Sequence, residues 1–379
     1  MKRYAAVLAF VVAGSPLSAA DANPCPGDPR GADAEWTLST TTFDLAFSRH
    51  PFVGNGYLGQ VVPPTGMGYV ATGEKTGWPL YTPRYDGAFV AGVYAQEPQL
   101  VGNRQVIAAI PTWTTLTLDV GDETYSPSTP ASQITGFRQT LFLRCGLLRT
   151  AMTWTTADGQ STNIVYDVLT DRAFAHVAAV RLSMTPRWSG LATVTAVLDG
   201  AGARRISATG GAAAPGDTTA DVTFSTHTTK IAGAVASTLR TGRNVLPKAR
   251  TSTVDGLTAR QAVTFPVRGG ESYELVKYVG VDTSLTSRRP RSAARAASRA
   301  AAARRAEWPE RSPARAYTAA AQSRSPRGPL EFRFLRGAEA APADRPRLPE
   351  STRAARRLPA GARIGRALRR RALERRSRN

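Results

Sequence analysis

Alternation of apolar and polar residues is the feature that most constrains this chain. In one run, the side chains of Leu148, Met152 and Trp154 fall on one face and polar side chains fall on the other. A period of two residues is that of β-strands with one buried face. The β pattern extends from Trp36 to about Thr283. Further alternating runs lie at Asn163–Val168, Ala192–Asp199 and Tyr273–Val281.

Asp-Gly pairs mark turns between the runs. Asp158-Gly159 separates two of them, and Asp255-Gly256 precedes another. Asp-Gly supplies the positive φ angles of tight hairpin turns, so consecutive strands are expected to pair antiparallel. This many strands requires two packed sheets. We therefore predict an all-β domain over residues 36–284, a large two-sheet antiparallel super-sandwich, with no helix of useful length before residue 288.

The charge of the chain is concentrated in its last quarter. The net charge is +21, but residues 288–379 hold 26 arginines and 7 acidic residues, and the remainder carries only +2. The charge therefore gives no reason to expect that the body binds nucleic acid. Residues 285–379 are rich in Arg, Ala and Pro, and we predict a disordered basic tail with one short basic helix at Ala293–Arg305.

The N-terminus has the pattern of a secretory signal peptide. Met1-Lys2-Arg3 is followed by an apolar run of eleven residues, and small residues then end at Ala20. Eleven residues are too few for a membrane-spanning helix, which needs about 20. We predict a signal peptide over residues 1–20, cleaved after Ala20, then a mobile arm over residues 21–35. The protein is thus expected to be secreted, with no membrane association after cleavage.

Cysteine and histidine are rare. Export to an oxidising compartment would allow a Cys25–Cys145 disulfide, and a buried Cys145 with a free Cys25 is an equal alternative. The three histidines, His50, His176 and His227, form no recognisable ligand pair. We predict no metal site and no cofactor.

One segment of the body lacks strand alternation. Pro63–Tyr85 is rich in glycine and proline and contains Trp78, Tyr81 and Tyr85. A long irregular loop in a compact domain is typically functional or disordered, and the aromatic content argues against disorder. These rings either present their faces to a sugar or pack against a neighbouring domain, and we favour packing because large aromatic side chains usually fill interfaces.

Five short motifs follow one another along the chain, beginning with Phe52-Val53-Gly54-Asn55-Gly56-Tyr57-Leu58-Gly59 and ending with Lys277-Tyr278-Val279-Gly280-Val281. In this order they resemble the N-terminal domain of glycoside hydrolase family 65. This family contains acid trehalases and the maltose, trehalose and kojibiose phosphorylases. The segment around Trp78 and Tyr81 is similar to the secreted acid-trehalase branch. The three motifs between the first and the last are Gly87-Ala88-Phe89-Val90-Ala91-Gly92-Val93-Tyr94, Ile110-Pro111-Thr112-Trp113 and Arg144-Cys145-Gly146-Leu147-Leu148-Arg149.

The resemblance implies an architecture and a reaction. In the family a β-super-sandwich precedes a helical linker and an (α/α)6 barrel, and the barrel carries the glutamate acid of an inverting reaction on α-linked glucosides. Inversion needs an acid on the leaving oxygen and an activated nucleophile across the ring. The chain is expected to lack the barrel, so we predict no catalytic residue and an inactive domain. The carboxylates near the aromatic loop, Asp44, Glu74 and Asp86, are interpreted as solvated loop residues.

The resemblance also implies a functional end of the sandwich, because in the family the segment with Asn55 and Tyr57 faces the barrel. We predict a carbohydrate- or barrel-facing surface formed by Asn55, Tyr57, Trp78, Tyr81 and Tyr85. For Asn55 and Tyr57, a turn-stabilising amide and a packed ring are the alternative interpretation.

Three interpretations of the whole chain remain. The first is the N-terminal domain of a secreted, trehalase-like family 65 enzyme, with a tail whose lysine-free composition is typical of an out-of-frame reading of a GC-rich gene. The second is a free-standing, non-catalytic carbohydrate-binding sandwich. The third is an exported polyanion-binding protein that uses its basic tail.

Overall fold

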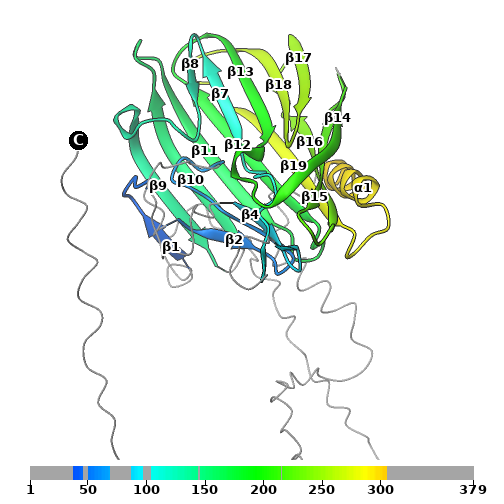
Figure 1. The fold of residues 1–379 in the computed structure, drawn as a ribbon. Coiled ribbons are helices and arrows are strands. Elements are labelled where there is room, and N and C mark those ends of the chain that lie inside the picture. The colour runs from blue at the N-terminus through cyan, green and yellow to red at the C-terminus, as the bar shows by residue number, and fades with distance from the viewer. Residues whose placement is uncertain are drawn as a thin grey trace, which may run out of the picture. The chain divides into compact units, whose positions relative to one another are not determined.

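The computed structural model describes residues 37–45, 50–68, 87–96, 104–143, 146–214 and 216–304. The chain divides into two units, residues 1–326 and 327–379, and every described residue belongs to the first. Within the described ranges, almost all regular structure is antiparallel β-sheet, as the alternation predicts. The predicted all-β sandwich is confirmed, and Figure 1 shows its two sheets facing each other.

The larger sheet has nine strands. Hydrogen-bonded neighbours include strands far apart in sequence, because β19 lies between β12 and β16. In spatial order the strands are β1 (Thr37–Thr40), β9 (Ile134–Phe142), β10 (Leu147–Thr155), β11 (Ser161–Thr170), β12 (Val177–Pro186), β19 (Tyr273–Thr283), β16 (Ala232–Thr241), β15 (Thr219–Thr226) and β14 (Ile206–Ala213).

A five-stranded sheet covers one face of the larger sheet. Its order is β17 (Ala249–Asp255), β18 (Thr258–Val267), β13 (Gly190–Leu198), β7 (Leu116–Val120) and β8 (Glu123–Tyr125). Two small sheets complete the fold: β2 (Phe52–Gly54), β3 (Leu58–Val61) and β4 (Ala88–Val90), and the pair β5 (Tyr94–Gln96) and β6 (Gln105–Ile107). Two 3-10 turns lie at Ala131–Gln133 and Gly200–Gly202.

The main core lies between the two large sheets. It contains the face that alternation predicts, because Leu148, Met152 and Trp154 are all buried there. The Tyr125 ring lies 5.6 Å from that of Trp154, and its hydroxyl donates to the Thr65 carbonyl at 2.8 Å. The buried tyrosines Tyr125 and Tyr166 thus fill the core with their rings while their hydroxyls donate to backbone carbonyls.

One lysine crosses this core. The Nζ of Lys277, on β19, donates to the carbonyl oxygens of Thr115 at 2.6 Å and of Val197 at 3.0 Å. Burial lowers the pKa of Lys277 well below its ordinary value, although the charge of Asp199 acts in the opposite direction. The lysine stem therefore links the nine-stranded sheet to the end of β13 and the residue before β7.

The predicted hairpin turns are present. Asp158-Gly159 joins β10 to β11, with Gly159 at φ 79° and its N–H donating to the Thr156 carbonyl at 2.9 Å. Gly256 joins β17 to β18 at φ 54°. These turns fix the register of two hairpins, which explains why local sequence was sufficient to find them.

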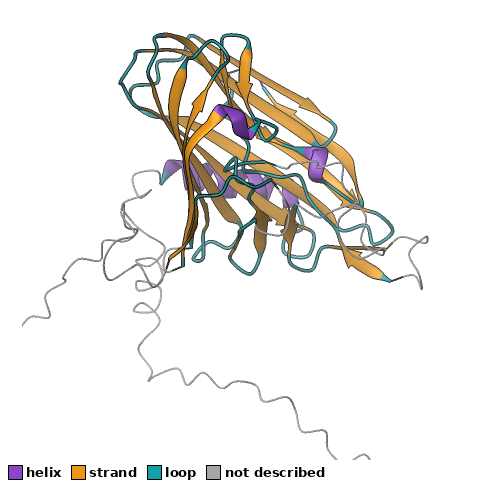
Figure 2. Ribbon diagram, turned by 90° about the vertical axis from the view of Figure 1, so that its left-hand side faces the viewer, coloured by secondary structure: helices purple, strands orange, loops and turns teal. Residues whose placement is uncertain are grey.

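The C-terminal boundary of the domain differs from the predicted one. The expected basic helix is present as α1 (Pro290–Ala303), but it packs on the sheet and does not belong to a separate tail. Its Ala301 and Ala302 contact Val177, Ala179, Val276 and Tyr278, whose side chains lie on the sheet face away from the main core. Figure 2 shows this helix against the sandwich. Composition indicated disorder here because the helix buries small side chains and pairs its arginines with distant aspartates.

Candidate functional site

Asn55 organises one end of the sandwich. It lies in the turn between β2 and β3, and its Oδ1 accepts hydrogen bonds from the backbone N–H groups of Tyr57 and Leu58, each at 3.0 Å. Its Nδ2 donates to the carbonyl oxygens of Asp171 at 2.6 Å and Ala175 at 2.9 Å. A side-chain amide can make four hydrogen bonds, and all four are used here. Asn55 is therefore a positioning residue that holds the loop 171–176.

Tyr57 and His176 form a tilted ring pair beside this turn. Their ring centroids lie 4.1 Å apart with an interplanar angle of 33°. Burial raises the pKa of Tyr57, and hydrogen bonds to Thr286 and Thr283 act in the opposite direction. The phenol is therefore neutral over the physiological range, and it presents a flat ring and a hydroxyl at the sandwich end.

Asp282, at the end of β19, orients the imidazole. The Nδ1 of His176 lies 3.1 Å from Asp282 Oδ2 and 3.1 Å from the Val281 carbonyl oxygen, both of which are acceptors. Nδ1 therefore carries a proton, and in the neutral ring Nε2 carries the lone pair. Asp282 Oδ1 also accepts from Thr286 Oγ1 at 2.7 Å. Among the described residues, no hydrogen bond reaches His176 Nε2.

The hydroxyl of Tyr57 completes this network. Its oxygen lies 3.4 Å from Thr286 Oγ1, and Tyr57 is the donor because the Thr286 proton is directed to Asp282. We call Asn55, Tyr57, His176, Asp282 and Thr286 the end cluster. It connects the β2–β3 turn, the loop before β12 and the segment between β19 and α1.

Exposed apolar side chains adjoin the end cluster. Phe174 is 48% exposed and lies in the loop that Asn55 holds, and Leu285 is 54% exposed and follows Thr283 at the end of β19. Phe52, on β2, is 53% exposed. The guanidinium carbon of Arg304, directly after α1, lies 3.9 Å from the centroid of the Phe174 ring. The end of α1 thus returns to the end cluster.

Several predicted site residues lie outside the described residues: Trp78, Tyr81 and Tyr85, both cysteines, and the carboxylates Glu74 and Asp86. Asn55 and Tyr57 are described, and they lie in the same turn. Whether they face a sugar or a second domain stays a prediction. His176, Asp282 and Thr286 were not expected beside them. The sequence signal that could have found Asp282 is the polar Asp282-Thr283 pair at the end of the last apolar strand. That signal does not reveal a contact with a histidine 106 residues earlier.

The described residues of this end offer groups that can take part in recognition. Asp282 is engaged by His176 and Thr286. Asp171, in the loop that Asn55 holds, accepts from the backbone N–H groups of Ala173 and Phe174. No three or more His, Cys, Asp or Glu residues in the described part of the chain are grouped to hold a metal ion. Searched over the same residues, no helix is long and apolar enough to cross a membrane. Aromatic faces, a partly exposed imidazole and apolar side chains suit a binding surface.

Comparison with known proteins agrees with this architecture. The chain is 31% identical over 189 residues to an acid trehalase of Emericella nidulans, which covers 45% of this chain and 18% of the relative. It is 27% identical over 292 residues to a cell wall acid trehalase of Arthroderma benhamiae, covering 70% of this chain and 27% of the relative. The chain thus spans about a quarter or less of these relatives.

The fold also matches a solved structure. A human-microbiome protein whose name assigns it as a kojibiose phosphorylase superposes with a TM-score of 0.56 at 14% identity, over 71% of this chain and 35% of that one. At this identity the likeness concerns the fold alone. The family model for the N-terminal domain of glycosyl hydrolase family 65 matches residues 40–312. This chain therefore belongs to glycoside hydrolase family 65, through the N-terminal domain of that family.

Proposed function

We propose that this sandwich is the secreted, non-catalytic N-terminal domain of a trehalase-like α-glucoside hydrolase, and that its end cluster binds the catalytic domain. The observation that carries the proposal is that three features lie together at one end of the sandwich. The Asn55–Tyr57 motif, the exposed Phe174 and Leu285, and the end of α1 all meet there. A chain that continues beyond α1 starts next to this surface.

The names of the relatives support export and a substrate class. Similar trehalases are named for the cell wall, the periplasm or secretion, which supports export of this chain, and cleavage after Ala20 is part of the proposal. The substrate class of α-linked glucosides rests on the same names. The domain would contribute to that activity by completing and stabilising the active site of its partner domain.

The first experiment tests catalysis by the sandwich itself. The mature chain is incubated with trehalose, maltose or kojibiose, with and without phosphate, and glucose and glucose 1-phosphate are measured. We expect no turnover above buffer, because a positioned acid and an oriented nucleophile each contribute orders of magnitude in rate. Turnover that disappears in Glu74→Ala or Asp86→Ala would place chemistry in the sandwich and overturn the proposal.

The second experiment tests binding to a catalytic domain. The barrel region of a family 65 acid trehalase is co-expressed with this chain, and trehalose hydrolysis and co-purification are measured. We expect both to depend on Phe174 and Leu285, since apolar side chains carry much of an interface's free energy. Phe174→Ser with Leu285→Ser should weaken pairing at least about tenfold. Trp78→Ala or Tyr81→Ala should act in the same direction.

Leu246→Ser is the matched control. Leu246 is 67% exposed, and it follows β16, whose last residue pairs with Leu275 at the other end of β19 from Thr283. Its substitution should leave pairing unchanged. An equal loss of pairing in the Phe174/Leu285 variant and the Leu246 variant, or no loss in either, would refute the assignment of the surface. Binding of trehalose or an α-glucan by the isolated chain would instead favour a free-standing carbohydrate-binding module.

A further inference from the structure

The outer face of the nine-stranded sheet contains a seat for helix α1. Asp221, Ala236, Gly280 and Val177 are register partners on β15, β16, β19 and β12, so they form one row across four strands. The helix follows this row, because its residues contact positions at both ends and in the middle of it. The contacts of α1 are polar at the β15 end of the row, with Asp221, and apolar at the β12 end, with Val177.

The middle of the seat is built for close approach. A side-chain carbon at Gly280 would overlap the carbonyl oxygen of Ala294 and lie 2.8 Å from the Ser298 nitrogen. Ala234 and Ala236 pack against Ala294 at the same place. Backbone atoms of the helix therefore rest directly on the sheet, and only glycine fits beneath them.

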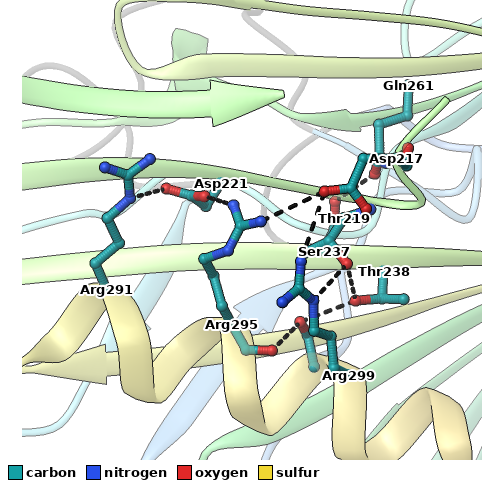
Figure 3. Close-up of polar contacts among 10 residues, drawn as sticks. Asp217, Thr219, Asp221, Ser237, Thr238, Gln261, Arg291, Arg295 and Arg299 are labelled. Carbon is teal, nitrogen blue, oxygen red and sulfur yellow. Dashed lines mark hydrogen bonds and ion pairs between the residues drawn. The ribbon is translucent and has the colours of Figure 1, made fainter. Parts of the chain in front are cut away.

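Three arginines of α1 form a ladder along the polar side. Arg291, Arg295 and Arg299 recur every four residues and so share one helix face. Asp221 is 0% exposed, accepts from Arg291 Nε at 2.8 Å, and is also paired with Arg295. Figure 3 shows the three arginines directed at the two aspartates, Asp217 and Asp221.

Asp217 continues the ladder. Arg295 Nη2 and Arg299 Nη2 each lie 3.5 Å from Asp217 Oδ2, and Arg299 Nε donates to Thr219 Oγ1 at 3.2 Å. In addition, Ser298 Oγ lies 3.0 Å from Thr238 Oγ1 in a buried pair. The strand residues that bind Ser298 and Arg299 thus precede them by about 60 to 80 positions in the sequence.

These polar contacts define one register. The helix is otherwise almost entirely alanine, and alanine contacts alone would tolerate a slip of one turn, about 5.4 Å. Such a slip would move an alanine into the place of Ser298 opposite Thr238, and it would remove Arg304 from Phe174. Buried polar groups are best attested as devices that fix register in this way.

We infer that helix α1 is a clasp with a single register, required to close the outer face of the sheet, and that it fixes the point at which the chain leaves the sandwich. That point is beside Phe174 and the end cluster. The single register of α1 is independent of the proposed function. The placement of a following domain by α1 rests on that function. The arginines that give residues 291–299 their basic composition therefore belong to the fold.

Hydrogen–deuterium exchange of the full chain tests the clasp. We expect the amides of residues 290–303 to be protected in the wild type. Asp221→Asn should accelerate their exchange at least about tenfold while the core strands stay protected, because local opening is governed by local contacts. Gly280→Ala should do the same by lifting the helix.

Asp167→Asn is the matched control. Asp167 is buried on β11 of the same sheet and is likewise held by two arginines, Arg149 at 2.7 Å and Arg181. No contact of Asp167 with α1 is present in the described residues. Its substitution should leave the relative protection of α1 unchanged. Unprotected α1 amides in the wild type, or equal effects of the two substitutions on α1, would overturn the inference.

If Asp221→Asn does not fold, Arg295→Gln gives the same test from the helix side, because it leaves the sheet intact and keeps Arg291 on Asp221. Faster exchange confined to α1 supports the clasp, and unchanged exchange refutes it. None of these readouts involves a catalytic domain. Failure of the clasp is therefore distinguishable from failure of the end cluster to bind one.

Discussion

The replacement of Asn55 by alanine tests whether the family's opening motif is structural. Alanine removes the two hydrogen bonds that Oδ1 accepts and the two that Nδ2 donates. A hydrogen bond contributes about 1 kcal/mol net. Because the site is half-buried and water can replace part of the loss, we expect the free energy of unfolding to fall by about 2–3 kcal/mol.

The assay is urea denaturation followed by tryptophan fluorescence, with two comparison variants. Asn55→Asp keeps the accepted bonds but directs an anionic oxygen at the carbonyls of Asp171 and Ala175, so it should be at least as destabilising as alanine. Asn163→Ala removes one exposed hydrogen bond, to Thr153, and should cost less than about 0.5 kcal/mol. A loss below that value for Asn55→Ala would refute the assigned role.

Two further predictions concern buried titratable groups. Burial lowers the pKa of Lys277, so the unfolded chain binds a proton more readily than the folded chain does. The free energy of unfolding should therefore rise with pH towards the ordinary pKa of 10.5. Lys277→Met should flatten this rise, which urea midpoints measured from pH 5 to 9 would show. Burial raises the pKa of Tyr125 and Tyr166 well above 10.0, so their absorbance at 295 nm should change only when the protein unfolds in alkali, and titration of all tyrosines before unfolding would contradict their burial.

Local patterns predicted the strands and hairpins because their causes are local. Alternation at Leu148, Met152 and Trp154 follows from one buried face, and Gly159 follows from a turn that needs positive φ. The end cluster could not be predicted in this way. Asn55 binds carbonyls 116 and 120 residues away, and no local pattern encodes a pairing at that separation.

The same limit explains why α1 was assigned to a tail. Four-residue spacing of arginine is visible in the sequence, but it indicates a seat only when Asp217 and Asp221 are known to face it. Disorder was predicted from a shortage of large apolar residues. The helix instead stabilises itself through backbone proximity over Gly280 and through charge pairs, two contributions that hydropathy does not measure.

The motif residues that the structure describes share a structural role. Asn55 uses its whole amide within the domain, Lys277 binds two backbone carbonyls across the core, Gly280 admits α1, and Trp113 is fully buried. Asn55 and Lys277 use their polar groups inside the domain, and the indole nitrogen of Trp113 is buried. The family resemblance therefore identifies an architecture, and the proposed binding surface consists of exposed neighbours that the motifs position. Phe174 and His176 are such neighbours, because the loop that carries them is held by Asn55 and lies where α1 ends. Substitutions in the motifs should thus act first on stability, whereas substitutions of Phe174 should act first on binding.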